Sequence, residues 1–161
     1  MENTVLMIQL ANHSQAQEIC DVLIRSITEL CHVDHQNSPE ILSKWLRNKK
    51  EEIALKWIDD PSANLFVALE DDKVQGVGQI DENGHILLCY VAPEASGRGL
   101  GQSLLNAMES QAGPLGLEKL TLESTTTAKG FYERNGYKLT DTKQVFGEMT
   151  SYHMEKNLKC C

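Results

Sequence analysis

The spacing of apolar residues predicts helices in the first third of the chain. Between residues 19 and 30 the apolar side chains recur every three or four positions, which is the period of an amphipathic helix. Asn12 or Ser14 can cap the start of this helix. Residues 39–46 and 51–58 show the same spacing, so we expect a second helix that is broken in the middle.

Short runs of strand-forming residues make up most of the remaining chain. The turn dipeptides Asp71-Asp72 and Asn83-Gly84 separate three of these runs, which therefore predict an antiparallel meander. The last of the three leads through a helical pattern into another run, and this step needs a parallel crossover. The expected fold class is α/β in the α+β sense, with a mixed, mostly antiparallel sheet and one parallel crossover. The predicted strands lie at residues 5–10, 65–69, 74–80, 85–91 and 119–123, with two more before the C-terminus.

A glycine-rich turn follows the strand at residues 85–91. Gly97, Gly99 and Gly101 stand at alternate positions at the start of the helix predicted at residues 100–111, so the main chain can come close to a ligand there. The free N–H groups of the helix's first turn and the positive end of its dipole point to the same place. This arrangement predicts a cradle for a pyrophosphate. It is neither a Walker loop, which needs a lysine after its last glycine, nor a dinucleotide fingerprint, which needs a glycine where Gln102 stands.

A second motif lies downstream, where a strand is followed by a short helix closed by Gly136. Together the two motifs resemble the GNAT superfamily of acyl-CoA-dependent N-acetyltransferases. The family's first motif, Gln/Arg-x-x-Gly-x-Gly/Ala after a strand and a proline, corresponds to residues 96–101. Its second motif, Ala-x-x-Phe/Leu-Tyr-Glu-x-x-Gly-Phe/Tyr, corresponds to residues 128–137. The chain departs from the family with Ser96 in place of Gln or Arg and with Thr125 in place of Asn.

The resemblance implies one N-acetyltransferase domain over residues 1–161 with the GNAT fold. In that fold the two parallel central strands splay apart at their C-terminal ends, and acetyl-CoA enters the gap. Main-chain N–H groups of the glycine-rich turn would hold the pyrophosphate, the Arg98 charge would add attraction, and the Val91 amide would face the thioester carbonyl. The residues implied to bind acetyl-CoA are Val91, Ser96, Gly97, Arg98, Gly99, Leu100, Gly101, Gln102, Ala128 and Tyr132.

The implied reaction is direct attack of an amine on the acetyl thioester, which needs a proton donor and a proton acceptor. Tyr132 is the candidate acid, because its hydroxyl can protonate the departing thiolate; core packing is the alternative reading of this side chain. His85 is the candidate base, because it lies eleven residues before Ser96, where histone-acetylating members of the family carry a catalytic glutamate. A solvated edge histidine is the alternative. Other candidates for the base are Glu82, Glu123, Asp34 and a chain of water molecules.

The composition agrees with one compact cytoplasmic enzyme domain. The 161 residues include 23 acidic and 15 basic ones, and the net charge of −8 disfavours nucleic acid and anionic membranes and suits an amine-bearing partner. No apolar run approaches the roughly 20 residues that span a bilayer. The five cysteines lack metal-ligand spacing and His32 with His35 lacks further ligands, so no metal is expected. A prenylated Cys160-Cys161 tail is an alternative that no other feature supports.

The sequence therefore predicts an acetyl-CoA-dependent N-acetyltransferase that acts on a primary amine of a small molecule, peptide or protein. The alternative is a CoA-binding sensor or interaction module that keeps the fold without turnover. Residues 31–60 and 142–149 are expected to select the acceptor, and no motif in them identifies it. Trp45 and Trp57 stand at helical spacing, which favours core packing or a homodimer interface.

Overall fold

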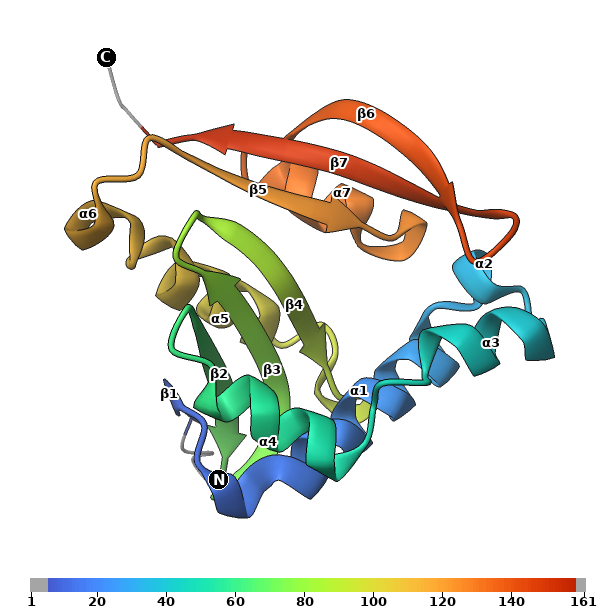
Figure 1. The fold of residues 1–161 in the computed structure, drawn as a ribbon, viewed down its shortest axis with the longest axis horizontal. Helices are drawn as coiled ribbons and strands as arrows, with labels where there is room; N and C mark the ends of the chain where they lie inside the picture. Colours follow the sequence, from blue (N-terminus) through green and yellow to red (C-terminus); the bar gives the residue numbers. More distant parts are fainter. Residues whose placement is uncertain (1–5, 159–161) are drawn as a thin grey trace.

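The computed structural model describes residues 6–158, which form one seven-stranded sheet with helices on both faces (Figure 1). Val5 of the predicted first strand and the Cys160-Cys161 pair lie outside the described residues. The strand order is β1-β2-β3-β4-β5-β7-β6, and all neighbours are antiparallel except β4 and β5. The predicted mixed sheet with one parallel crossover is thereby confirmed. The strands are β1 (Leu6–Leu10), β2 (Ala63–Glu70), β3 (Lys73–Asp81), β4 (His85–Val91), β5 (Lys119–Ser124), β6 (Lys138–Val145) and β7 (Met149–Asn157).

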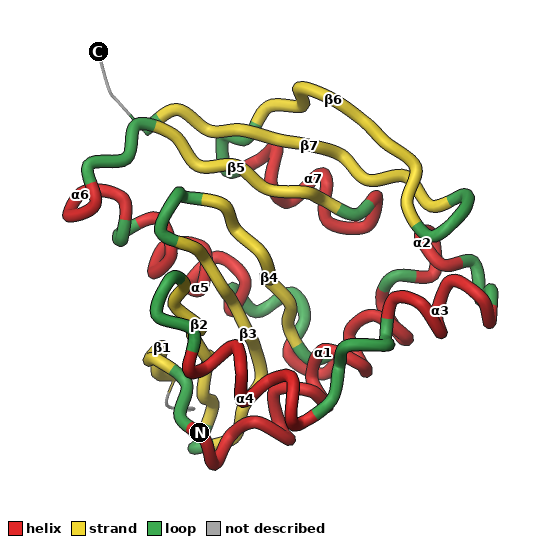
Figure 2. Tube along the Cα trace, in the orientation of Figure 1, coloured by secondary structure: helices red, strands yellow, loops and turns green. Residues whose placement is uncertain are grey.

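The helices follow the predicted pattern with three differences (Figure 2). Asn12 is the cap, but it caps a 3-10 turn (His13–Gln15) that leads directly into the first helix, so that helix begins at Ala16. Two four-residue helices, α2 and α6, were not predicted, because each spans hardly more than one turn and shows no periodicity. The helices are α1 (Ala16–Leu30), α2 (His32–His35), α3 (Pro39–Trp45), α4 (Glu51–Asp59), α5 (Leu100–Glu109), α6 (Ala112–Leu115) and α7 (Thr126–Arg134).

The two parallel strands separate almost as soon as they have paired. Only His85 with Thr121 and Ile86 with Leu122 are partners between β4 and β5, and the rest of β4 has no partner on that side. Figure 1 shows the two strands diverging toward their C-terminal ends. The predicted splay of the central strands is confirmed, and it leaves an open edge in the middle of the sheet.

An extra residue in β4 decides which side chains face each side of the sheet. Gln79 of β3 pairs with Leu88, but the next residue, Ile80, pairs with Ile86, so Leu87 is left without a partner. A bulge of this kind shifts the alternation of side chains beyond it by one position. Ile86 is consequently buried at 4% exposure, whereas the side chain of Leu87 stays 47% exposed.

Close packing of α5 on the sheet fixes the position of the glycine-rich turn. Helices α1 and α4 cover one face of β2, β3 and β4, and α5 covers the other (Figure 1). A Cβ atom on Gly76 would lie 2.9 Å from Leu104, and one on Gly78 would lie 3.0 Å from Met108. Both helix side chains are fully buried. The two glycines of β3 therefore let α5 approach the strand closely.

Replacing Gly76 should destabilise the fold. The new Cβ atom of Gly76→Ala would also meet Ala68 at 3.2 Å, and a buried core has little room to give way. Overpacking of this kind costs about 1–3 kcal/mol, which corresponds to a fall in Tm of roughly 2–12 °C for a chain of this size. Gly130→Ala is the control, because its Cβ atom would meet only the mobile end of Arg134. A thermal melt of Gly76→Ala that equals that of wild type would contradict this close packing of α5 on β3.

Candidate active site

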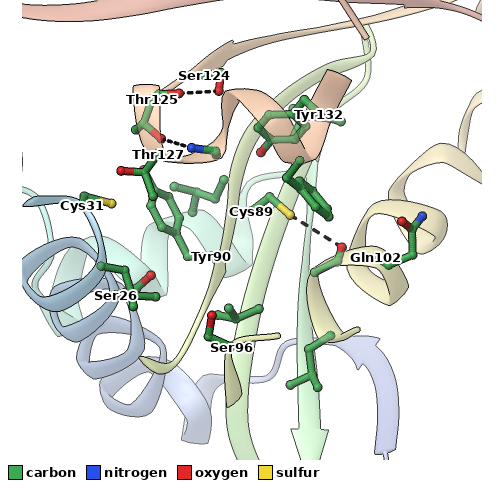
Figure 3. Close-up of a pocket in the computed structure, with 18 of the residues that line it drawn as sticks. Ser26, Cys31, Cys89, Tyr90, Ser96, Gln102, Ser124, Thr125, Thr127 and Tyr132 are labelled. Atoms are coloured by element: carbon green, nitrogen blue, oxygen red, sulfur yellow. Dashed lines mark hydrogen bonds between the residues drawn. The ribbon is translucent and has the colours of Figure 1, made fainter. Parts of the chain in front are cut away.

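A cavity of about 480 Å³ lies where β4 and β5 diverge (Figure 3). The C-terminal half of β4 and the turn between β5 and α7 form two of its walls. Ser26, Leu30 and Cys31, at the end of α1, line it on one face of the sheet, and Gly101 and Gln102 of α5 line it on the other. The cavity therefore passes through the sheet, from the α1 face to the α5 face.

The N-terminus of α5 is open toward this cavity. Its N-cap residue is Gly99, which has no side chain to accept a hydrogen bond from the first turn. Gly97 and Gly99 adopt φ values of +80° and +86°, which favour glycine, and a Cβ atom on either would have no neighbour within 4 Å. The N–H groups of Leu100 and Gly101 are thus free to bind an anion at the positive end of the helix dipole.

The N-terminus of α7, across the cavity, is closed instead. Thr125 caps the helix, because its Oγ1 accepts from the N–H of Ala128 at 3.0 Å. Asp34 accepts from the N–H of Thr126 at 2.6 Å and from the N–H of Thr127 at 3.1 Å. These bonds satisfy the first turn of α7, so an anion in the cavity finds free donors at α5. They also show what Thr125 does in place of the family's Asn, since both side chains can cap a helix.

Nearly all residues predicted to bind acetyl-CoA line the cavity. The exception is Arg98, whose guanidinium donates to Glu70 Oε1 at 2.7 Å on the β2 side of the turn. Its charge is therefore held by a carboxylate away from the lining. The predicted residues that line the cavity are Val91, Ser96, Gly97, Gly99, Leu100, Gly101, Gln102, Ala128 and Tyr132.

The backbone of Val91 faces the gap between the splayed strands. The N–H of the next residue, Ala92, donates to Gln75 O of β3 at 2.8 Å. Because backbone groups of successive residues in a strand point to opposite edges, the N–H of Val91 points away from β3. No β5 residue pairs with β4 at this level. The Val91 amide is thus a donor aimed into the cavity.

Tyr132 is buried at 6% exposure beside Cys89, and both line the cavity (Figure 3). Burial raises the pKa of Tyr132 well above its ordinary value, and the neighbouring Cys89 raises it further. Burial also raises the pKa of the Cys89 thiol to about 12. Both groups are therefore protonated at neutral pH. The Tyr132 ring packs edge-on against Phe131 and Tyr137, with centroids 5.2 and 5.7 Å away.

Three of the candidate bases lie outside the cavity lining. His85 stands at the paired end of β4, where its Nδ1 lies 2.7 Å from Thr121 Oγ1. Glu82 is exposed in the turn between β3 and β4. Both oxygens of Asp34 accept hydrogen bonds from the start of α7. The role predicted for His85 stays a prediction, to be tested against the remaining carboxylate.

Glu123, at the end of β5, is the candidate base that does line the cavity. It pairs with His153 of β7, whose Nδ1 lies 2.7 Å from Glu123 Oε1, and Ser151 donates to its other oxygen at 3.2 Å. Tyr152, next to His153, bonds to Thr126 of α7, so His153 and Glu123 face away from α7. Glu123 therefore lies on the face of the sheet that α1 covers, opposite the anion cradle at α5. Its side chain is 33% exposed.

Several residues in the cavity lining or bonded to it gave no signal in the sequence. His153 comes next to Glu123 only through the register of β5 with β7, 30 residues apart in the chain. Ser26, Leu30 and Cys31 belong to a helix whose periodicity indicates packing alone. Of the two segments expected to select the acceptor, only Cys31 lies in the cavity lining.

The tryptophans pack inside the protein. Trp45 is 7% exposed and forms a small second core with Ile27, Cys31 and Met149, while Trp57 packs against the main core. Met149 ends the second segment expected to select the acceptor. The two segments therefore meet in a core beside the cavity, where they hold its α1 wall in place.

Comparison with known proteins assigns the chain to a family. Residues 33–158 match the acetyltransferase (GNAT) domain family, and the chain belongs to this family. It is 27% identical over 145 residues to the uncharacterized N-acetyltransferase YafP of Escherichia coli K12, covering 86% of each chain. It is 27% identical over 142 residues to the peptidyl-lysine N-acetyltransferase YjaB of Salmonella typhimurium, covering 88% of this chain and 89% of YjaB.

The fold also matches a solved structure. The PaiA N-acetyltransferase from Thermoplasma acidophilum, in complex with coenzyme A, superposes with a TM-score of 0.81 at 21% identity, covering 95% of this chain and 99% of that one. The predicted family, fold class and enzyme class, an acetyl-CoA-dependent N-acetyltransferase, are thus confirmed.

Within residues 6–158 no helix is long and apolar enough to cross a bilayer. The same residues contain no group of three or more His, Cys, Asp or Glu side chains placed to hold a metal ion. His35 instead bonds inside the protein, with its Nε2 3.1 Å from Thr28 O. The cytoplasmic location, the single domain over residues 1–161 and the homodimer stay predictions.

Binding of acetyl-CoA should depend on the space in front of α5. A ligand at 100 times its Kd adds about 2.7 kcal/mol of stability, so saturating acetyl-CoA should raise the Tm of wild type by roughly 5–11 °C, whereas NAD and ATP should not. Gly101→Val should abolish this shift, because its branched side chain would stand beside Phe131 where the phosphates must approach. Ser103→Val, on the same helix but outside the cavity lining, should keep it. A wild-type melt that acetyl-CoA leaves unmoved would refute the cradle.

Proposed function

We propose that this protein transfers the acetyl group of acetyl-CoA to a primary amine, with the two substrates entering the cavity from opposite faces of the sheet. The observation that carries this proposal is the contrast between the two sides of the cavity. The α5 face offers free backbone N–H groups to an anion, and the α1 face offers the carboxylate of Glu123 to a cation. An anionic donor and a cationic acceptor would thus meet at the open edge of β4.

The α5 side of the cavity is suited to hold acetyl-CoA, the acetyl donor. The N–H groups at the start of α5 would bind the pyrophosphate, and the open edge of β4 would pair with the pantetheine arm as an added strand would. At the end of this edge the N–H of Val91 would donate to the thioester oxygen. A hydrogen-bond donor fixed in this way stabilises the negative charge that develops on the thioester oxygen while the amine attacks.

Tyr132 would protonate the departing thiolate. Its hydroxyl keeps its proton at neutral pH because burial raises its pKa, and it lies beside Cys89, two residues before Val91. In a buried site a thiolate is poorly solvated, so a nearby proton donor lowers the barrier to its departure. Burial thus supports the role of Tyr132 as the acid.

Glu123 would take the proton from the amine. It lines the cavity on the α1 face, where its carboxylate would attract an ammonium group and then accept a proton from it. His153 and Ser151 fix the orientation of the carboxylate through both of its oxygens. The acceptor class is supported by YjaB, a peptidyl-lysine N-acetyltransferase, so the side-chain amine of a lysine in a peptide is the first acceptor to test.

A panel of amines, with release of CoA as the readout, tests the function. Wild type should release CoA with at least one primary amine, and Tyr132→Phe should lower kcat by about 10²- to 10⁴-fold while keeping its Kd for acetyl-CoA. The ring and its packing are retained in this variant, so Tm should change little. If wild type binds acetyl-CoA but releases CoA with none of the amines, the protein is a CoA-binding sensor instead. A fully active Phe variant would refute the acid role.

The base is tested by comparing two matched substitutions. Glu123→Gln keeps the shape and the hydrogen bond from Ser151 but removes the proton acceptor, so kcat should fall by about 10²- to 10⁴-fold. His85→Gln should leave kcat and its pH profile unchanged, because its ring lies outside the cavity lining. The reverse result would return the role of base to His85. Normal turnover in both variants would favour a chain of water molecules.

A further inference from the structure

Asp34 is a buried carboxylate whose hydrogen bonds all go to a distant helix. Its side chain is 5% exposed, on the short helix α2 that follows the cavity wall formed by Leu30 and Cys31. Its two oxygens accept from the N–H groups of Thr126 and Thr127, and the Thr127 hydroxyl donates to it at 2.5 Å. The partners are 92 and 93 residues away in the chain.

The short helix α2 is itself fixed to α1 on its other side. His35 is completely buried, with its Nε2 donating to Thr28 O at 3.1 Å, while its Nδ1 accepts from the N–H of Asn37 at 2.9 Å. A ring nitrogen that accepts from a backbone N–H carries no proton, so the proton is on Nε2. Because α2 is bonded to α1 through His35 and to α7 through Asp34, it connects the α1 wall of the cavity to α7.

The bonds to α2 add to the modest packing of α7 on the sheet, where Ala128 and Phe131 are partly buried against the core. Of its nine residues only Tyr132 is buried, and an isolated helix of this length is marginal in water. Tyr132 follows Thr126 by less than two turns, so a change in the tilt of the first turn moves its hydroxyl relative to Cys89 and Val91. The charge of Asp34 at the N-terminus also favours this helix through its dipole.

We infer that Asp34 is a positioning residue, which holds α7 against the α1 wall and so places the hydroxyl of Tyr132 for its role as the acid. The inference rests on the proposed function, since it takes Tyr132 to be the acid. It adds that the wall on the acceptor side and the helix that carries the acid are held as one unit. A displacement of about 1 Å in such a group can reduce turnover by about 10²-fold.

Substitution of Asp34 should change turnover in a way that a general loss of stability would not. Asp34→Ala, assayed well below its Tm, should lower kcat by about 10- to 100-fold and change the KM for acetyl-CoA less than kcat, because the cradle is on α5. Asp34→Asn, which keeps one accepting oxygen, should restore part of kcat. Ser38→Ala is the control: it removes the cap of the neighbouring helix α3 without touching α7, so it should lower Tm and leave kcat unchanged.

A double variant tests whether Asp34 acts through Tyr132. In the background of Tyr132→Phe, Asp34→Ala should lower kcat by less than about threefold, because the hydroxyl that it positions is absent. If the two losses multiply in full, Asp34 does not act through Tyr132 and the inference is overturned.

Hydrogen exchange gives a readout that does not need activity. In Asp34→Ala, or in Asp34→Asn if the Ala variant does not fold, the amides of α7 should exchange faster, while those of α5 should not. Unchanged exchange in α7 would overturn the inference even with an active enzyme. If wild type turns over no amine, the proposed function fails, and faster exchange confined to α7 still supports the anchoring by Asp34.

Discussion

The separation of β4 from β5 after two residue pairs is the constraint on which the rest of the structure depends. Backbone N–H and C=O groups inside a protein are strong hydrogen-bonding groups, and leaving a strand edge unpaired is costly unless something else binds there. This chain keeps the open edge because the other edge of β4 is paired with β3 and because α5 packs closely on the two glycines of β3. The cavity, the free amide of Val91 and the passage through the sheet all follow from that one separation.

Two of the helices that border the cavity, α5 and α7, use the same physical effect in opposite ways. Each has a positive N-terminal end with unpaired N–H groups. At α7 a threonine and a distant aspartate satisfy these groups, whereas at α5 a glycine leaves them free. The N–H groups at the start of α5 stay free because Gly99 has no side chain to accept from them, whereas Thr125 and Asp34 accept from those of α7. An anion in the cavity is therefore expected on the α5 side.

The local parts of the site could be predicted from the sequence, and its long-range parts could not. The glycine-rich turn and the Phe131-Tyr132 segment are contiguous motifs, so their chemistry can be recognised from the sequence alone. The alternatives for the base stayed open because Glu123 acquires His153 only through strand register, and Asp34 acquires its partners 92 and 93 residues away. Helix α2 was missed because four residues are too few to show a period. The bulge at Leu87, which sets the faces of β4, likewise depends on pairing with β3.

The passage through the sheet has a kinetic consequence. A pocket with a single opening makes the second substrate wait for the first and makes one product leave before the other. Here the lining reaches from Ser26 on the α1 face to Gln102 on the α5 face, so in the proposed reaction each substrate would have its own route to the reacting atoms. A ternary complex would then assemble in either order, and the acetylated acceptor would leave while CoA is still bound. In the proposed reaction, release of the product from one face would therefore not have to wait for release from the other.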